Sequence, residues 1–359
     1  MKTICFFSGD ITRGGGTERT AIRLANALQE KNKDLRILFL SLTEGKKKPV
    51  FPISPHIRRS YLCDHWINPG PGYLFLIPKV RKYLQDKKAD VVIDIDVVLD
   101  VLSVPAAGRL PVRVISWEHF DFSYEMAVFY RRMILKHYTK KTAAIVTLTK
   151  AGARSLSDYI GRKDGIFTIA NPMPAPAEKI AEQREKQLLT VGHLLAVKGS
   201  DLIVPMAKEL FERFSDWKWV IVGEGELYER IKADAKNAGL SDRLILTGAV
   251  QDVGPYYRRA SIYVCPSRSE GFPMTILEAQ AARLPVVAFS MAGTGELVLD
   301  EVNGRLLPME DTKAMTEALC SLMENDSLRG SYASHALDRA ERFSEERILS
   351  EWERVIREA

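Results

Sequence analysis

Short runs of Val, Ile, Leu and Phe alternate with longer segments of helical period along almost the whole chain. Such alternation is typical of parallel β-sheets covered by helices on both faces. One proline-rich break, Ala170–Ala177, interrupts it, because three prolines in eight residues leave too few amide donors for a strand and clash within a helix. The pattern restarts after the break. It therefore predicts two doubly wound α/β domains and not one eight-stranded barrel, whose repeats should run without interruption.

The length of the chain agrees with this division, because 359 residues suit two domains of about 150–200 residues each. We place the first domain at residues 1–170, the second at 171–342 and a final helix at 343–359. A typical helix is expected over Thr17–Gln29, with its apolar residues on one face. The predicted strands are Thr3–Ser8, Arg36–Ser41, Val91–Asp94, Val112–Ser116, Ala144–Thr147 and Phe167–Ile169, then Leu188–Val191, Trp219–Val222, Leu244–Thr247, Ile262–Cys265, Val286–Ala288 and Arg305–Leu307.

Open sheets of this kind bind ligands beyond the carboxyl ends of their strands. Two such domains that face each other are expected to enclose a cleft. The residues with a functional role should therefore lie in loops that directly follow strands, and three such loops carry suggestive residues.

The first of these loops follows the opening strand and contains Gly14, Gly15 and Gly16 ahead of a predicted helix. Glycines let the backbone approach a ligand closely, and the amides at a helix N-terminus attract anions. The loop lacks the GxGxxG spacing of a dinucleotide site and the GxxxxGK[ST] phosphate loop, which disfavours a nicotinamide cofactor and an ATPase. A plain flexible turn is the alternative interpretation.

The other two loops belong to the second domain. The loop Gly192–Gly199 carries Lys198 just before a predicted helix, where an ammonium can balance a diphosphate, although a solvated surface lysine is the alternative. The loop after Ile262–Cys265 holds Glu270, and Glu278 lies about one turn into the helix that follows. A carboxylate can accept two ribose hydroxyl hydrogens, and the amides between the glutamates can bind phosphate or sugar oxygens; two unrelated surface charges are the alternative.

The segment from Glu270 to Glu278, with Gly271 and Phe272, resembles the motif of glycosyltransferase family 4, a group of retaining enzymes with the two-domain GT-B fold. The resemblance covers nearly the whole chain. Its further parts are the first glycine loop, His119 in Trp117-Glu118-His119, the Gly192–Gly199 loop, the turn Gly223-Glu224-Gly225, Gly248 before the base-binding loop, and Ser344–Ile356 with Trp352, which looks like the last helix that crosses back onto the first domain.

The resemblance implies roles for individual residues. Glu278 would hold the ribose, Lys198 would neutralise the diphosphate, and Glu270 would hold the donor sugar together with the following backbone. His119 would lie near the transferring sugar, so the implied catalytic residues are His119, Lys198 and Glu270. The other residues implied in nucleotide-sugar binding are Gly15, Gly16, His193, Gly223, Val250, Gly271, Phe272, Pro273, Met274 and Thr275.

One position departs from the family pattern. The family usually has arginine where this chain has His193. A neutral imidazole supplies less charge to a leaving diphosphate than a guanidinium does. Arg268 and Arg13 are the candidates to compensate for it.

The implied activity is transfer of a hexose or N-acetylhexosamine from a nucleotide-sugar, with a UDP-sugar favoured. The acceptor would be a glycan or a polyprenyl-diphosphate-linked sugar in bacterial surface polysaccharide synthesis. No residue is an obvious carboxylate nucleophile for double displacement, and the resemblance to the family implies front-side attack, in which the leaving phosphate accepts the acceptor's proton. Two other functions stay open: a sugar-nucleotide epimerase of the same fold, which needs no acceptor, and a two-domain solute-binding protein, which binds without turnover.

Asp94-Ile95-Asp96 gives a competing signal, because Asp-x-Asp binds a divalent metal and a diphosphate in the single-domain GT-A glycosyltransferases. The pair ends a first-domain strand, whereas the nucleotide loops lie in the second domain. The four cysteines are widely spaced and predict neither a disulfide nor a zinc site. We therefore expect an enzyme that requires no metal or other cofactor.

The charge of the chain is unevenly distributed. Residues 1–170 hold 28 Lys and Arg against 16 Asp and Glu, a net +12, while residues 171–359 hold 23 against 30, a net −7. A basic domain suits an anionic membrane or a phosphorylated acceptor, and no nucleic-acid partner is expected. A merely solvated surface is the alternative.

Two segments of the basic domain have the character of membrane-surface elements. Ser123–Lys141 reads as a basic amphipathic helix, and the apolar run Tyr73–Ile77 adjoins Lys79, Arg81 and Lys82. The alternative for the helix is packing on its own sheet. No apolar run reaches the ~20 residues of a membrane span, and the opening residues lack the apolar run of a secretory signal. The sequence thus predicts a cytoplasmic protein, in peripheral contact with the inner face of the cell membrane.

Overall fold

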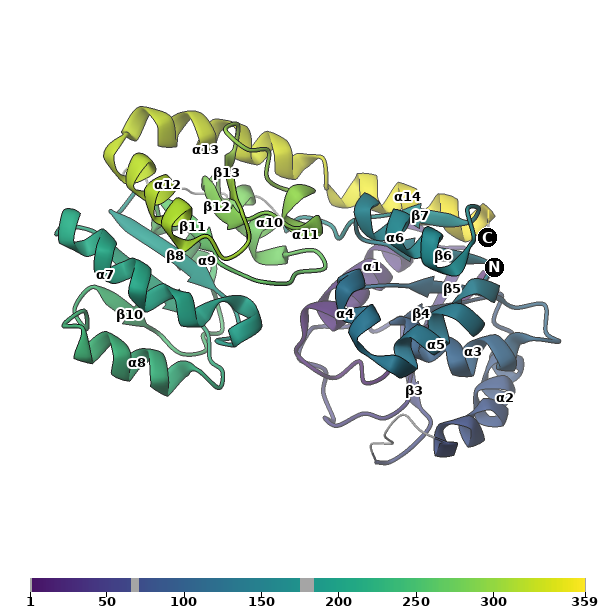
Figure 1. The fold of residues 1–359 in the computed structure, drawn as a ribbon. Helices are drawn as coiled ribbons and strands as arrows, with labels where there is room; N and C mark the ends of the chain where they lie inside the picture. Colours follow the sequence, from purple (N-terminus) through teal and green to yellow (C-terminus); the bar gives the residue numbers. More distant parts are fainter. Residues whose placement is uncertain (1, 66–70, 175–183, 359) are drawn as a thin grey trace. The chain divides into compact units, whose positions relative to one another are not determined.

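The computed structural model describes residues 2–65, 71–174 and 184–358 (Figure 1). The chain divides into two compact units. Unit 1 comprises Met1–Asn171 with Glu346–Ala359, and unit 2 comprises Pro172–Glu345. Of the proline-rich segment predicted to link the domains, residues 175–177 lie outside the described part. In the described part, the Met173 amide donates to the Phe343 carbonyl at 2.7 Å.

Unit 1 is built on a seven-stranded sheet in the order β3-β2-β1-β4-β5-β6-β7, and all neighbouring strands are parallel. The interior strands are apolar because both faces of the sheet are covered by helices (Figure 1). The strands are β1 (Lys2–Ser8), β2 (Leu35–Ser41), β3 (Arg58–Tyr61), β4 (Val91–Ile95), β5 (Arg113–Trp117), β6 (Ala144–Thr147) and β7 (Ile166–Thr168).

Unit 2 has a six-stranded parallel sheet in the order β10-β9-β8-β11-β12-β13. A large apolar cluster packs helices against this sheet, with Trp219 and Phe289 among its fully buried side chains. The strands are β8 (Gln187–Val191), β9 (Lys218–Val222), β10 (Leu244–Leu246), β11 (Ile262–Cys265), β12 (Val286–Phe289) and β13 (Gly304–Leu307).

Most of the helices lie between successive strands, whereas α12, α13 and α14 follow the last strand, β13. In unit 1 they are α1 (Gly16–Lys31), α2 (Ile77–Lys87), α3 (Asp100–Ala107), α4 (Phe122–Ala127), α5 (Phe129–His137), α6 (Lys150–Ile160) and α14 (Glu345–Glu358), with 3-10 turns η1 (Pro71–Leu76), η2 (Val97–Leu99) and η3 (Thr139–Lys141). In unit 2 they are α7 (Ile203–Arg213), α8 (Tyr228–Asn237), α9 (Gly254–Arg259), α10 (Met274–Ala281), α11 (Ala292–Gly295), α12 (Thr312–Glu324) and α13 (Asp326–Glu341), with η4 (Ala196–Lys198) and η5 (Ser200–Leu202).

The prediction of two doubly wound parallel sheets is confirmed, and each predicted strand corresponds to an observed one. The sequence pattern missed β3, because this edge strand has the sequence Arg-Arg-Ser-Tyr and lacks an apolar run. It also read residues 123–141 as one helix. That was wrong: Val128 takes an extended conformation and separates α4 from α5, and η3 follows. The predicted cleft between the domains stays a prediction.

Helix α14 completes the core of unit 1. Trp352 is only 1% exposed, and its ring meets Trp117 of β5 edge-on, with 4.6 Å between ring centroids. The Lys2 ammonium donates to the Ile356 carbonyl at 2.7 Å, and the Arg113 guanidinium donates to the same oxygen at 3.1 Å. These two cations satisfy a carbonyl near the end of the helix, where the backbone has no partner of its own.

In each sheet the strand order reverses between two neighbouring strands. The candidate sites are expected at the carboxyl ends of these two strands. In unit 1 the reversal falls between β1 and β4, and in unit 2 between β8 and β11. The loops that leave such a pair of strands run to opposite sides of the sheet and leave a crevice at its carboxyl edge. The sequence-predicted loops after β1, β8 and β11 are therefore at switch points.

Candidate functional site

The switch point of unit 2 brings together two of the predicted site residues. The Lys198 ammonium, at the end of η4, lies 2.8 Å from Oε2 of Glu270 in the loop after β11. The other oxygen, Oε1, accepts a hydrogen bond from the Ser267 hydroxyl at 2.9 Å. Both side chains of the ion pair are partly exposed to solvent. A cation and a carboxylate are thus held together where an open sheet binds its ligand.

Gly199 explains how the two loops come so close. Its φ of +66° is in the left-handed region, and a Cβ there would lie 1.9 Å from the Pro266 carbonyl oxygen. Only glycine allows the loop after β8 to contact the loop after β11 in this way. The close contact sets the distance between Lys198 and Glu270.

The predicted residue Gly223 performs a similar role on the other side. A Cβ at Gly223, whose φ is +145°, would lie 1.9 Å from the Gly192 carbonyl oxygen. The Leu194 amide donates to the Glu224 carbonyl at 2.9 Å, and the Gly223 amide donates to the Gly248 carbonyl at 3.0 Å. The loops after β8, β9 and β10 are therefore tied to one another through their backbones.

Glu278 is buried in α10 and held by a residue that sequence reasoning missed. The Tyr257 hydroxyl, on α9, donates to Oε2 of Glu278 at 3.0 Å. Tyr257 itself is buried and packs against Tyr263 of β11, with 5.8 Å between ring centroids. No motif marks Tyr257, because it belongs to a helix rather than to a loop that follows a strand. The contact fixes the orientation of the predicted ribose-binding carboxylate.

The remaining predicted residues of unit 2 occupy the same carboxyl edge. Phe272 is buried, and its ring packs edge-on against Phe343 with 5.6 Å between centroids. Gly293 approaches from α11, where a Cβ would lie 2.6 Å from the Glu270 carbonyl oxygen. The others are Gly271 in the loop, Pro273 as N-cap of α10, Met274 and Thr275 in its first turn, and Val250 shortly after Gly248.

The two arginines considered as substitutes at the His193 position have other partners. The Arg268 guanidinium bonds both carboxylate oxygens of Asp201, at 2.6 and 2.9 Å, and also Glu310 at 2.5 Å. Arg13 forms an ion pair with Glu18 at 3.0 Å within unit 1. His193 itself is exposed. Arg268 therefore serves to hold the loops after β8, β11 and β13 together.

His119 follows β5 in unit 1 and is buried against an aromatic stack. Its ring lies 4.4 Å from that of Trp117, centroid to centroid. Burial lowers the pKa of His119 to about 3, so the imidazole is neutral at physiological pH. Among the described residues, its buried Nε2 atom has no hydrogen-bond partner. A neutral His119 can exchange a hydrogen bond but supplies no charge.

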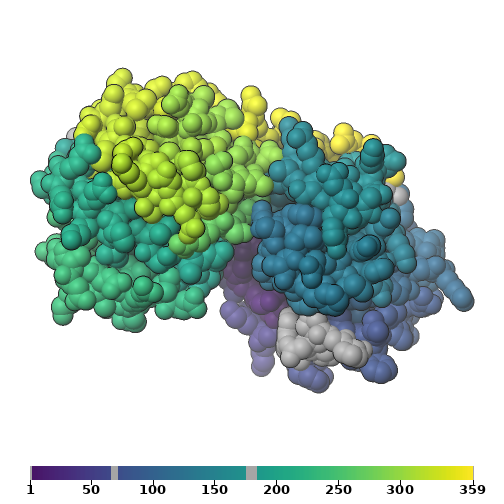
Figure 2. Space-filling view, viewed as in Figure 1, coloured from purple at the N-terminus to yellow at the C-terminus, as the bar shows by residue number. Residues whose placement is uncertain are grey.

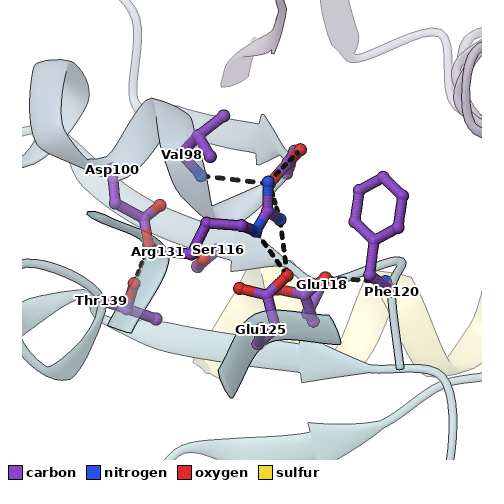
Figure 3. A network of polar contacts seen from close by, with 9 residues as sticks. Val98, Asp100, Ser116, Glu118, Phe120, Glu125, Arg131 and Thr139 are labelled. Atoms are coloured by element: carbon purple, nitrogen blue, oxygen red, sulfur yellow. Dashed lines mark hydrogen bonds and ion pairs between the residues drawn. The ribbon is translucent and has the colours of Figure 1, made fainter. Parts of the chain in front are cut away.

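The Asp-x-Asp pair at the end of β4 is engaged within unit 1. Asp94 is fully buried and accepts a hydrogen bond from the Ser103 hydroxyl. Asp96 pairs with Arg131 at 2.6 Å, and the same guanidinium contacts Glu125 at 2.6 Å (Figure 3). In the described part of the chain, no three His, Cys, Asp or Glu side chains gather in a way that suits a metal ion. The two aspartates thus have structural partners in place.

The glycine loop after β1 lies at the switch point of unit 1. Gly15 is the N-cap of α1, and Gly16 is the first residue of that helix. Gly9, Arg13 and Gly15 line a cavity of about 430 Å³ in unit 1. The roles of Gly15 and Gly16 in nucleotide-sugar binding stay predictions, as do those of the residues of unit 2.

Comparison with known proteins identifies the class. The model of "Glycosyltransferase Family 4" matches residues 14–174, and that of "Glycosyl transferases group 1" matches residues 175–339. An uncharacterized glycosyltransferase of Haemophilus influenzae is 32% identical over 360 residues, which cover 99% of this chain and 100% of the relative. With the two doubly wound sheets, these matches define a glycosyltransferase with the GT-B fold. Within that class, the chain belongs to glycosyltransferase family 4.

Two further proteins are similar to this chain, one over part of its length and one at low sequence identity. The lipopolysaccharide core biosynthesis mannosyltransferase LpcC of Rhizobium leguminosarum bv. viciae is 35% identical over 151 residues, 41% of this chain and 43% of the relative. The structure of Anabaena HepE in complex with UDP has a TM-score of 0.85 and 18% identity, and covers 100% of both chains. At this identity the structural match shows the fold alone.

None of the described helices is both long enough and apolar enough to cross a bilayer.

Proposed function

We propose that unit 2 binds the nucleotide-sugar donor, with a UDP-sugar favoured, and that the enzyme retains the anomeric configuration. The contact between Lys198 and Glu270 at the unit 2 switch point supports this proposal, because it joins the lysine proposed to neutralise the diphosphate to the glutamate proposed to hold the sugar. Glu278, held by Tyr257, is suited to accept the ribose hydroxyls. The match to a UDP-bound structure supports UDP as the first nucleotide to test.

The proposed reaction is front-side displacement at the anomeric carbon. The bond from that carbon to the leaving diphosphate oxygen breaks, and a bond to the acceptor hydroxyl oxygen forms on the same face. The acceptor proton passes to the leaving phosphate, which becomes more negative as the bond breaks. Lys198 stabilises this developing charge, and a fixed cation does so without rearranging. His119, neutral through burial, acts as a hydrogen-bonding group toward the transferring sugar.

The donor site as proposed needs no metal ion or other cofactor. The positive charge for the diphosphate comes from Lys198 and from the backbone amides at the start of α10. The Asp-x-Asp pair has an arginine and a serine as partners in unit 1. This distribution of partners supports metal-independent transfer.

We assign the acceptor to unit 1 and the biological role to synthesis of bacterial surface polysaccharide. The similarity to a lipopolysaccharide core mannosyltransferase supports that role. The acceptor class is then a glycan or a polyprenyl-diphosphate-linked sugar. The reaction is assigned to the cytoplasmic side of the membrane, where the donor is available.

Unit 1 is also proposed to rest on an anionic membrane. The two segments with this predicted character both present apolar side chains: Phe75 of η1 is 80% exposed and Phe129 of α5 is 69% exposed. Helices α4 and α5 belong to the outer surface of unit 1 that faces the viewer (Figure 2). Flotation with vesicles of anionic lipid tests this proposal. Retention at low salt that weakens in Phe75→Ser and Phe129→Ser is expected, and failure to float would refute it.

Thermal-shift screening against UDP, GDP and ADP, followed by hydrolysis assays with a panel of UDP-hexoses, tests the proposed activity. Stabilisation by one nucleotide and slow hydrolysis of the corresponding sugar donor are expected. Conversion of the nucleotide-sugar to an isomer without an acceptor would instead identify an epimerase. Binding without any turnover, with or without acceptor, would instead indicate a solute-binding protein.

A further inference from the structure

The cavity of unit 1 has the position and size of a ligand site. Its volume of about 430 Å³ falls within the range of about 300–1,000 Å³ that is usual for small-molecule sites. It opens where β1 and β4 end, at the switch point of the sheet. Every residue that lines it belongs to unit 1.

Aromatic rings from separate elements line this cavity. They come from η1, the loop after β5, α4 and α5, and they are Tyr73, Phe120, Tyr124 and Tyr130. The rings of Phe120 and Tyr124 contact each other, with 5.2 Å between centroids. An aromatic face carries negative charge density, which suits the weakly positive C–H face of a pyranose ring. Three of the four rings are well exposed, and exposed aromatic side chains that converge on a cavity are typical of a binding surface.

The cations of the cavity are already neutralised by the protein. Arg131 is buried between Asp96 and Glu125, each at 2.6 Å, and its guanidinium also lies over the Phe120 ring, 4.9 Å from the centroid. Arg13 is paired with Glu18 at 3.0 Å. Arg131 has two carboxylate partners and Arg13 has one. These two arginines therefore leave no excess of positive charge for an anionic ligand.

The N-terminus of α1, which also borders the cavity, is covered by a carboxylate of its own helix. Glu18 lies in the first turn of α1 and is buried. A Cβ built on the N-cap residue Gly15 would lie 2.4 Å from Oε2 of Glu18, so this side chain folds back over the helix start. Its negative charge lies beside the glycine loop and lowers the attraction of this end of the cavity for an anion.

Asp96 supplies the polar group that an uncharged sugar requires. Its φ of +107° is in a region that residues with side chains rarely adopt, and such strain is concentrated at functional sites. Its oxygens accept bonds from the Val98 amide at 3.1 Å and from Arg131 at 2.6 and 3.3 Å. A carboxylate has about four acceptor positions, so one remains for a ligand hydroxyl.

We propose that this cavity binds an uncharged pyranose ring of the acceptor, which stacks on Tyr124 and Tyr130 and donates a hydroxyl hydrogen to Asp96. The inference rests on the proposed function, because it assigns the acceptor to unit 1, and it names the class of acceptor: a neutral sugar and not a phosphorylated or acidic one. The basic residues of this half of the chain do not determine the choice, since the cations at the cavity are paired with carboxylates.

Saturation-transfer NMR on the full chain tests the proposal. The probes are the methyl pyranosides of glucose, galactose and mannose, compared with the 6-phosphates of the same sugars and with glucuronate. We expect at least one neutral pyranoside to bind, and the matching phosphate to bind at least fivefold more weakly. Tyr124→Ala and Tyr130→Ala should each lower the affinity about threefold to tenfold.

The control variants distinguish loss of the aromatic ring from damage to the fold. Tyr124→Phe and Tyr130→Phe keep the ring and should bind within about twofold of wild type. Tyr61→Ala removes an exposed tyrosine on β3, away from the cavity lining, and should have no effect. Preference for the phosphates, failure of every neutral pyranoside, or equal binding by the alanine variants would overturn the proposal. Nucleotide binding by unit 2, measured on the same samples, shows whether the proposed function fails as well.

Discussion

The Lys198 ammonium lies 2.8 Å from Oε2 of Glu270, so the lysine assigned to the diphosphate and the glutamate assigned to the sugar contact each other directly. The contact joins the loops that leave β8 and β11. Partly exposed ion pairs of this kind contribute little to stability, typically about 0–1 kcal/mol. We therefore expect this pair to matter for catalysis more than for folding.

Replacement of Lys198 or Glu270 by alanine should lower kcat/KM about 100- to 1,000-fold, because each change removes a preorganised electrostatic or sugar contact. The melting temperature should change little. Lys186→Ala is the matched control, since it breaks an exposed ion pair with Asp216 in the same unit. Steady-state transfer assays decide the matter, and unimpaired transfer in both site variants would remove the assignment.

The hydrogen bond from Tyr257 to Glu278 leads to a second prediction. Tyr257→Phe should raise the KM for the donor about threefold to tenfold and leave kcat nearly unchanged, since a bond to a charged group is worth about 1.5–3 kcal/mol and the carboxylate can recover part of it. Tyr256→Phe, at the adjacent position of α9, is the control. A fall in kcat at constant KM would contradict a role limited to positioning Glu278.

Sequence reasoning pointed to the loop residues of the candidate donor site but not to the helix residue Tyr257 that contacts Glu278. Lys198 and Glu270 are recognisable because parallel strands end at one edge of a sheet and their loops must meet there. Tyr257 contacts Glu278 from a different helix, and hydrophobic periodicity gives no sign of such a pair. The arginine at position 268 looked available for phosphate, and only the structure shows its bonds to Asp201 and Glu310.

The aromatic cavity of unit 1 was missed for a related reason. Tyr73, Tyr124 and Tyr130 lie in two segments that the sequence marks as apolar and basic, and the pattern alone suggests a membrane surface. Val128 breaks the second segment into α4 and α5. The rings of Tyr124 and Tyr130 both reach the cavity, which is formed by elements distant in sequence. Periodicity describes one element at a time and does not show which elements share a cavity.

Chelation tests the proposal that no metal is required. Transfer activity should stay within about twofold of the untreated enzyme in EDTA, because fixed protein cations, and not a metal ion, neutralise the leaving group. Addition of magnesium or manganese should change the rate little. Complete loss in EDTA with recovery on adding manganese would show that a metal takes part.

The aromatic contact between Trp352 and Trp117 should be important for the stability of unit 1. Trp352→Ala removes a side chain that is almost fully buried and should lower the free energy of unfolding by about 3–5 kcal/mol. Arg354→Ala, on the exposed side of the same helix, should change it by less than about 0.5 kcal/mol. Urea unfolding followed by tryptophan fluorescence measures both, and equal effects would show that α14 does not stabilise the unit through this contact.

The buried pair Asp94 and Asp100 gives unit 1 a predicted pH dependence. Burial raises the pKa of both carboxyl groups, and the proximity of the two groups raises the pKa of Asp100 further. Among the described residues, neither Oδ1 atom has a hydrogen-bond partner, and a proton shared by the two neighbouring carboxyl groups would supply one. An unfolded aspartate has a pKa of about 3.9. Above that pH, the folded pair therefore binds more protons than the unfolded chain, and its contribution to the free energy of unfolding falls as pH rises.

His119 has the opposite effect. Its pKa in the folded protein, about 3, is below the ordinary value of 6.5. Its contribution to the free energy of unfolding therefore rises as the pH increases between these two values. Asp94→Asn isolates the carboxyl pair: relative to wild type, its free energy of unfolding should increase on the order of 1 kcal/mol from pH 5 to pH 8. Asp86→Asn, at an exposed position paired with Lys82, should show no such trend. Urea unfolding at pH 5, 6.5 and 8 provides the comparison. A constant difference between Asp94→Asn and wild type would mean that the pair binds no extra proton in the folded protein.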